Sequence, residues 1–175
     1  MELYAGFIQT KNKKPLKEFK DGKNLISYDW ARQLPEYAGV LNDNIILVDV
    51  DDKETSNIVL RIINDLGIHC FVVDTTRGKH FLFQNTDVST NKTKTNTAIG
   101  IKVDIKLGSR NSYQVLKYNG VVRKWIRKCE IPDLLPFWLR PVKHNTDFAT
   151  LGEGDGRNQA LFNYILTLQS VGYER

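Results

Sequence analysis

The stretch Asn44-Ile-Ile-Leu-Val-Asp-Val-Asp-Asp52 joins an apolar run to a group of aspartates. The apolar run predicts a buried β-strand with an acidic end. Side chains two positions apart on a strand point to the same face, so we expect Asp49 and Asp51 to converge and Asp52 to point away. Two adjacent carboxylates repel unless a proton or a cation neutralises them, which makes a divalent metal ion a natural ligand of the pair. The alternative is that the aspartates only end the strand and cap the following helix.

The surrounding sequence predicts an α+β fold with a mixed β-sheet core and helices packed on one face. A helix is expected over residues 53–66, because Ile58, Ile62 and Leu66 recur at a spacing of four, with Val59 and Ile63 beside them. The polar stretch 85–97 predicts a mobile surface loop. Apolar runs rich in β-branched and aromatic residues predict strands over 3–9, 44–50, 70–75, 80–84, 99–107 and 113–118.

The last part of the chain predicts a second unit. The glycine-rich stretch 152–156 is typical of a linker, and the apolar periodicity from Ala160 through Leu168 predicts a helix that follows it. We therefore divide the chain into a catalytic domain over 1–145 and, over 146–175, a linker with the start of a C-terminal helical domain. The helix is still amphipathic near the end of the sequence, so we expect the chain to be part of a longer protein.

The composition bounds the classes of function. The 175 residues suffice for one compact core, and 41% hydrophobic and 26% charged residues are ordinary for a soluble globular protein. We expect no signal peptide and no membrane span. The two cysteines are too few for a disulfide framework or a four-ligand zinc site, which fits a cytoplasmic location. The net charge of +5 suits a polyanionic partner, although many basic proteins bind no nucleic acid.

A second acidic feature lies in Ile101-Lys-Val-Asp-Ile-Lys-Leu-Gly108. Asp104 is in the middle of this apolar strand, and Lys102 and Lys106 share its face by alternation. An aspartate within a strand is unfavourable unless it is paired or ligated. It is therefore either a metal ligand or a partner of these two lysines on a solvated face.

A third feature is the turn in Asp74-Thr-Thr-Arg-Gly-Lys-His-Phe-Leu-Phe83, between two apolar runs. Gly78 permits the turn and lets the backbone approach a ligand. Arg77, Lys79 and His80 supply positive charge and hydrogen bonds, which could cradle a triphosphate. The alternative is a basic hairpin turn with a half-exposed histidine.

The chain carries three motifs in the order Asp49-Val50-Asp51, His80 and Asp104. This order resembles the three motifs of the archaeo-eukaryotic primase superfamily, specifically the bifunctional primase-polymerase domains of phages and plasmids. The upstream sequence is also similar to such domains, which have a basic-proline turn, a helix with a tryptophan and a strand that leads into the first motif. The matching segments are Lys14-Pro15-Leu16, Trp30 and residues 37–41, in that order. The resemblance covers residues 3–118 and implies an RRM-like primase-polymerase fold. The Thr-Arg-Gly-Lys lead before His80 and the lack of zinc-binding insertions depart from the family.

The resemblance implies a nucleotidyltransferase that acts as DNA primase and DNA polymerase on a single-stranded DNA template, with NTP or dNTP substrates. In this family Asp49, Asp51 and Asp104 would hold two Mg²⁺ or Mn²⁺ ions and no zinc, and His80 would contact the nucleotide phosphates. The resemblance also implies a helicase domain in the full-length protein and a location in the cytoplasm of a host cell. Further candidates for nucleotide or template contact are Thr76, Arg77, Lys79, Lys106, Arg110 and Ser112.

Two other functions stay open. Asp104-Ile105-Lys106 also matches the aspartate-x-lysine element of metal-dependent nucleases, with Asp51 as the upstream carboxylate, although that leaves His80 unexplained. A non-catalytic module that binds replication-origin DNA through its basic surface is the second alternative.

Overall fold

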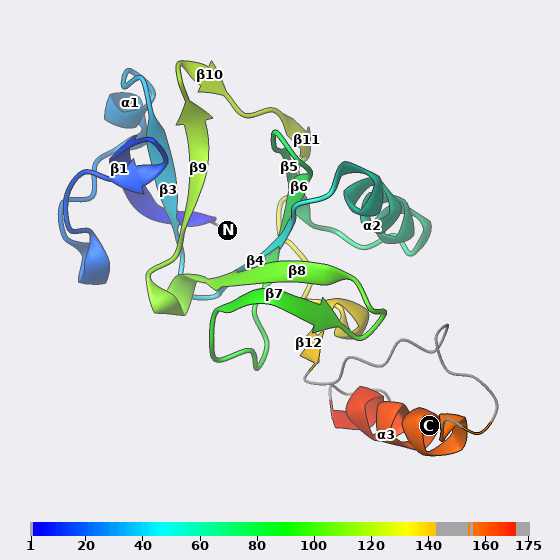
Figure 1. The fold of residues 1–175 in the computed structure, drawn as a ribbon. Helices are drawn as coiled ribbons and strands as arrows, with labels where there is room; N and C mark the ends of the chain where they lie inside the picture. Colours follow the sequence, from blue (N-terminus) through cyan, green and yellow to red (C-terminus); the bar gives the residue numbers. More distant parts are fainter. Residues whose placement is uncertain (1, 143–153, 155, 171–175) are drawn as a thin grey trace.

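The structure, a computed structural model, describes residues 2–142, 154 and 156–170. Two antiparallel sheets lie next to each other (Figure 1). The first has the order β10-β9-β3-β1-β2, with β1 (Tyr4–Lys11), β2 (Lys14–Pro15), β3 (Tyr37–Leu41), β9 (Tyr113–Tyr118) and β10 (Val121–Val122). The second has the order β11-β5-β6-β4-β8-β7-β12, with β4 (Ile45–Val50), β5 (Phe71–Asp74), β6 (Lys79–Gln84), β7 (Lys92–Thr97), β8 (Lys102–Leu107), β11 (Trp125–Arg127) and β12 (Pro141–Val142). The chain passes from the first sheet to the second, returns to the first for β9 and β10, and then rejoins the second with β11 and β12.

The α+β class is confirmed, but the prediction of a mixed sheet is wrong, because every pair of named strands is antiparallel. The cause lies in the connection from β4 to β5. This connection runs through helix α2 (Lys53–Asp65) and leaves β5 parallel to β4, but β6 lies between them and pairs antiparallel with both.

Helix α2 packs on one face of the second sheet and begins at a well-formed cap. Asp52 is the N-cap residue, and its carboxylate accepts a hydrogen bond of 2.6 Å from the backbone N–H of Thr55. The predicted helix is confirmed, but Val59 and Ile63 form its buried stripe, whereas Leu66 is 60% exposed. Of Asp49, Asp51 and Asp52, only Asp52 therefore caps the helix.

The central strand β4 is buried along its whole length and separates two apolar clusters. Ile46 and Val48 pack with α2, and Ile45 and Leu47 pack on the opposite face with residues from the first sheet. Asp49 follows Ile45 and Leu47 in the alternation, so it lies on the face that is turned toward the first sheet. At Asp49, the side chains between the two sheets change from apolar to polar.

Residues 92–97 form a strand, so the prediction of a loop over 85–97 is wrong there. β7 is polar and mostly exposed, and backbone pairing with β8 holds it in place. The last long helix agrees with the prediction, since α3 spans Arg157–Ser170, but most of the predicted linker lies outside the described residues. Within the described ranges, no helix has both the length and the apolar character needed to cross a bilayer. The short helices are η1 (Lys20–Gly22), α1 (Tyr28–Ala31), η2 (Gly108–Arg110) and η3 (Phe137–Leu139).

Candidate active site

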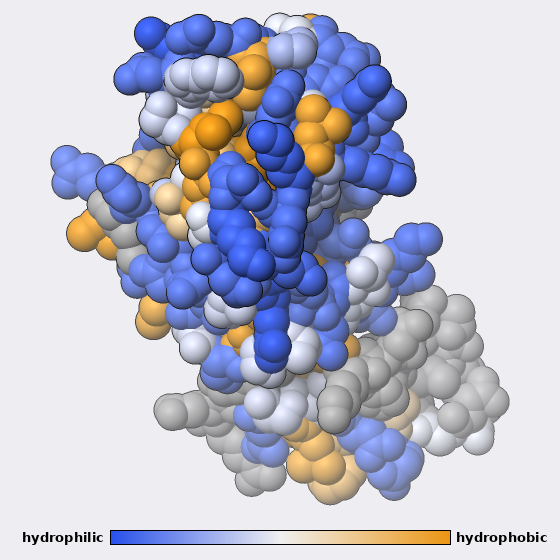
Figure 2. Space-filling model, turned by 90° about the vertical axis from the view of Figure 1, so that its left-hand side faces the viewer, coloured by the Kyte–Doolittle hydropathy of each residue, from blue (hydrophilic) through white to orange (hydrophobic). Residues whose placement is uncertain are grey.

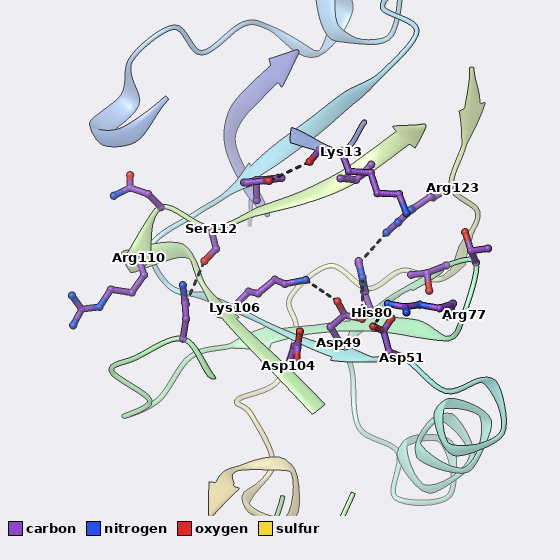
Figure 3. Close-up of a pocket in the computed structure, with 16 residues that line it drawn as sticks. Lys13, Asp49, Asp51, Arg77, His80, Asp104, Lys106, Arg110, Ser112 and Arg123 are labelled. Carbon is purple, nitrogen blue, oxygen red and sulfur yellow. Dashed lines mark hydrogen bonds and ion pairs between the residues drawn. The ribbon is translucent and has the colours of Figure 1, made fainter. Parts of the chain in front are cut away.

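A cleft with a volume of about 530 Å³ opens between the two sheets. One wall is the face of β4, β6 and β8 in the second sheet, and the other comes from η2, β9 and the tip of the β1–β2 hairpin (Figure 3). The cleft is lined by Lys13, Asp49, Asp51, Thr75, Thr76, Arg77, His80, Asn91, Asp104, Lys106, Arg110, Asn111, Ser112, Tyr113, Val115 and Arg123.

Three adjacent strands bring the predicted catalytic residues together. Asp49 of β4 is the direct cross-strand partner of His80 in β6 and of Asp104 in β8. Directly opposed residues on one face have Cβ atoms about 4.5 to 5.5 Å apart. Asp51 follows the end of β4 and lines the same cleft. Residues from three separate parts of the sequence thus converge around Asp49.

Asp49 is an almost buried carboxylate between two positively polarised groups. Its Oδ2 accepts a hydrogen bond of 2.7 Å from Lys106 Nζ, and its Oδ1 lies 3.3 Å from His80 Nε2. That second contact is longer and falls short of full hydrogen-bond geometry, so among the described residues Oδ1 has only this weak polar contact. Burial alone would raise the pKa of Asp49, but His80 and Lys106 together hold it well below its usual value. Asp49 is therefore ionised at neutral pH.

The other side of His80 is fixed by a buried chain of hydrogen bonds. Tyr4 donates from its hydroxyl to Gln114 Oε1 over 2.6 Å, which leaves Gln114 Nε2 to donate to His80 Nδ1 over 2.8 Å. Because the Gln114 amide nitrogen can only donate, Nδ1 of His80 accepts and the proton of the neutral ring lies on Nε2, toward Asp49; burial lowers the pKa of His80 and favours this neutral form. Room for the Tyr4 ring exists because residue 39 is glycine: a Cβ there would lie 2.5 Å from Tyr4 Cδ1.

The two remaining carboxylates have different partners. Asp51 is half-exposed and pairs through Oδ2 with the guanidinium group of Arg77. Asp104 accepts a hydrogen bond of 2.7 Å at Oδ1 from the backbone N–H of Lys94. The expected alternative, an ion pair of Asp104 with Lys102 or Lys106, is not formed among the described residues, since Lys106 turns to Asp49 instead.

The residues of this cleft fit a divalent metal ion in their chemistry. Carboxylate oxygens are the preferred ligands of Mg²⁺ and Mn²⁺, and the buried Oδ1 of Asp49, which lacks a full hydrogen bond among the described residues, is available as a metal ligand. In the described part of the chain, no three acidic, histidine or cysteine side chains are gathered closely enough to surround an ion as they stand. Binding would thus require Asp51 and Asp104 to rotate toward Asp49, with Arg77 and Lys106 released from their carboxylates.

Most of the nucleotide-binding residues predicted from the sequence line the cleft, namely Thr76, Arg77, His80, Lys106, Arg110 and Ser112. Lys79 does not line the cleft. It is 6% exposed, and its Nζ donates to Asn57 Oδ1 over 2.6 Å and lies 3.7 Å from Asp74 Oδ1. The physical reason is the alternation along β6, which turns Lys79 and His80 to opposite faces of the sheet.

Several cleft residues carry no signal in the sequence. Arg123 follows β10 and brings one guanidinium nitrogen to 3.5 Å from His80 Nδ1, and Lys13 reaches the cleft from the β1–β2 turn. Gln114 and Tyr4 act through His80 and are equally ordinary in sequence. Five cationic side chains line the cleft against three carboxylates, so the cleft has an excess of positive charge once His80 is neutral. Such a cleft attracts a polyanion.

Neither a protein-family model nor a curated protein matches this chain. A fold class alone does not determine function, because one architecture supports many chemistries. The evidence for function is therefore the geometry of the cleft.

Proposed function

We propose that this chain is the primase-polymerase domain of a phage or plasmid replication protein, with an RRM-like primase-polymerase fold. In this proposal it joins nucleotides into primers on a single-stranded DNA template, using NTP or dNTP substrates, in the cytoplasm of a host cell. The observation that carries it is the convergence of Asp49, Asp51, Asp104 and His80 on one cleft that has an excess of cationic side chains. A helicase domain in the full-length protein belongs to the same proposal.

The three carboxylates are the proposed ligands of Mg²⁺ or Mn²⁺. Asp49 is held ionised by Lys106 and His80, and Asp51 and Asp104 lie on the same wall of the cleft. Bound ions would supply activation of the attacking 3′-hydroxyl and neutralisation of charge on the triphosphate. The protein contributes the fixed strand positions of Asp49 and Asp104, since cross-strand pairing sets their relation before any ligand binds.

The cationic side chains are the proposed binding groups for the triphosphate. Arg77 and Lys106 neutralise Asp51 and Asp49 in the structure, and a triphosphate in the cleft would compete for the same two cations. Arg110 and Arg123 line other parts of the wall. The Nε2–H of neutral His80 can donate to an oxygen in the cleft without adding charge. Thr76 and Ser112 offer hydroxyl groups nearby.

The direct test is primer synthesis on single-stranded DNA by the double variant Asp49→Ala, Asp51→Ala. We expect no product with Mg²⁺ or Mn²⁺, because two of the three candidate ligands are gone. Asp65→Ala is the matched control, since this aspartate is exposed at the end of α2. Circular dichroism of each variant checks the fold. Full activity of the folded double variant would refute the assignment.

A metal-dependent nuclease is the second candidate, because one observation favours it. Asp104 and Lys106 lie on one face of β8, and Lys106 Nζ contacts Asp49, which groups a lysine with two carboxylates. Labelled single-stranded DNA incubated with Mg²⁺, with and without nucleotides, separates the two activities: shortening indicates a nuclease and extension indicates a polymerase. DNA binding without metal-dependent nucleotide binding would instead indicate a non-catalytic module.

A further inference from the structure

We infer that the β1–β2 hairpin and the groove beside Trp30 form a binding surface for single-stranded nucleic acid that continues from the catalytic cleft. That the bound strand is a template rests on the proposed function, but the binding itself does not. The surface, called here the hairpin surface, consists of the lysines of residues 11–23 and the groove around Trp30.

The hairpin surface contains an unusual density of unpaired positive charge. Residues 11–23 include six lysines against Glu18 and Asp21. Lys23 pairs with Glu18 at 3.3 Å and Lys13 lies over the ring of Tyr118. The other four lysines are exposed and have no acidic partner among the described residues: Lys11, Lys14, Lys17 and Lys20. Exposed lysines without acidic partners favour a polyanion, since phosphate binding releases its condensed counterions.

A groove of about 210 Å³ lies on this surface next to an exposed indole. Trp30 lines the groove together with Lys17 and Asn24 on its polar side, and its side chain is 64% exposed. Figure 2 views the molecule from the side of β1 and η1 and shows apolar side chains exposed between hydrophilic ones. The rest of the groove is mostly aliphatic, from Ile8, Leu25, Ile26 and Leu34. An exposed aromatic ring in a groove with lysines beside it is an arrangement on which bases of single-stranded nucleic acid stack, independently of sequence.

The hairpin connects this groove to the catalytic cleft. Lys13 lines the cleft and Lys17 lines the groove, so one short segment contributes a lysine to each. Four residues of chain span at most about 14 Å, which brings the two depressions within reach of one strand of nucleic acid. Asn12 and Lys13 both have positive φ, at 52° and 65°, a conformation that asparagine tolerates but that is unfavourable for lysine. That turn directs the lysine to the cleft despite the strain.

The test is binding of fluorescein-labelled oligothymidylate in EDTA, without nucleotide, measured by fluorescence anisotropy over a range of salt concentrations. We expect Trp30→Ala to weaken binding by about 5- to 150-fold, the range for loss of one stacked base, and Trp30→Phe to keep most of the affinity. Lys14→Gln with Lys17→Gln should weaken binding and reduce the slope of log K against log salt by about 1.4. The charge-matched control is Lys53→Gln with Lys124→Gln, exposed lysines away from the hairpin, which should bind as the wild type does.

The inference would be overturned if both Trp30→Ala and the Lys14, Lys17 double variant bound oligothymidylate with wild-type affinity. It would also be overturned if the control variant lost as much affinity as these variants. Competition by polyglutamate as strong as competition by unlabelled oligothymidylate would also overturn it, because the surface would then recognise acidic peptides. Failure of the proposed function gives a different result: oligonucleotide binding through the hairpin surface with no primer synthesis.

Discussion

Gln114 of the first sheet donates a hydrogen bond of 2.8 Å to Nδ1 of His80 in the second sheet. The bond joins the two sheets at the floor of the cleft and determines which ring nitrogen carries the proton. Because Tyr4 fixes the orientation of the Gln114 amide, the protonation of His80 depends on two residues, Tyr4 and Gln114, that are far from it in the sequence.

Gln114→Glu should favour the protonated form of His80. A carboxylate at position 114 accepts a hydrogen bond from Nδ1–H, so it raises the pKa of His80 and favours the imidazolium ion. We expect ¹⁵N chemical shifts of His80 to show the protonated ring at a higher pH than in the wild type, together with reduced nucleotidyl transfer. Tyr4→Phe is the milder comparison, since it removes only the hydroxyl that orients Gln114. Identical ¹⁵N titrations of wild type and Gln114→Glu would contradict the tautomer assignment.

The sequence predicted the acidic wall of the cleft because that wall depends on local alternation. Asp49 on β4 and Asp51 just past its end line the same cleft, and Asp104 is directed by the same rule on β8. The same rule, applied to β6, separates Lys79 from His80, and the prediction overlooked it. Alternation therefore determines which residues of a known strand share a face, once the strand is recognised.

The opposite wall could not be predicted in this way. Arg123, Gln114 and Tyr4 reach the site only because the first sheet docks against the second, and docking depends on packing between residues distant in sequence. β7 was missed for a related reason, since its polar side chains give no strand signal and its structure comes from backbone pairing with β8.

Acid should reduce the stability that Asp49 contributes. The pKa of Asp49 is lower in the folded state than the value of about 3.9 expected in the unfolded chain. The contribution is therefore fully present above pH about 4 and is lost as the pH falls toward the lower folded-state pKa. We expect wild type to exceed Asp49→Asn in free energy of unfolding by about 2 to 3 kcal/mol at pH 7 in EDTA, with a difference that narrows below pH 4. Urea denaturation at several pH values measures this; a gap independent of pH would contradict it.

Arg77→Gln should increase the affinity for metal ions. The guanidinium group competes for Asp51, and both side chains are at least half-exposed, so the pair is weak. Removing an exposed ion pair of this kind should strengthen Mn²⁺ binding by about two- to fivefold, as measured by calorimetry without nucleotide. Arg61→Gln, on the exposed side of α2, is the control and should leave Mn²⁺ binding unchanged. Weaker Mn²⁺ binding in Arg77→Gln would show that the arginine supports the carboxylate and does not compete for it.

Lys79 and Lys106 should respond differently to the same substitution. Lys106→Met removes a proposed triphosphate-binding cation from the cleft, so we expect loss of Mn²⁺-dependent nucleotide binding. Lys79→Met affects only contacts on the opposite face, with Asn57 and Asp74, and should leave nucleotide binding intact. Calorimetric titration with nucleotide and Mn²⁺ distinguishes the two variants. Equal loss in both would show that Lys79 contributes to the cleft after all.

Gly78→Ala should destabilise the turn that carries Arg77. A Cβ at position 78 would lie 1.9 Å from the carbonyl oxygen of Val50, the residue between Asp49 and Asp51. The turn must move away from the end of β4, at a cost of about 2 kcal/mol or more, which lowers the melting temperature by roughly 4 to 8 °C. Gly67→Ala is the control: it has a positive φ of 65° but no atom within 4 Å of the added Cβ, so only strain of about 1 kcal/mol is expected. Because the clash also displaces the backbone between two candidate metal ligands, Gly78→Ala should lose metal binding while Gly67→Ala keeps it. An unchanged melting temperature for Gly78→Ala would mean that the turn does not pack against β4 in solution.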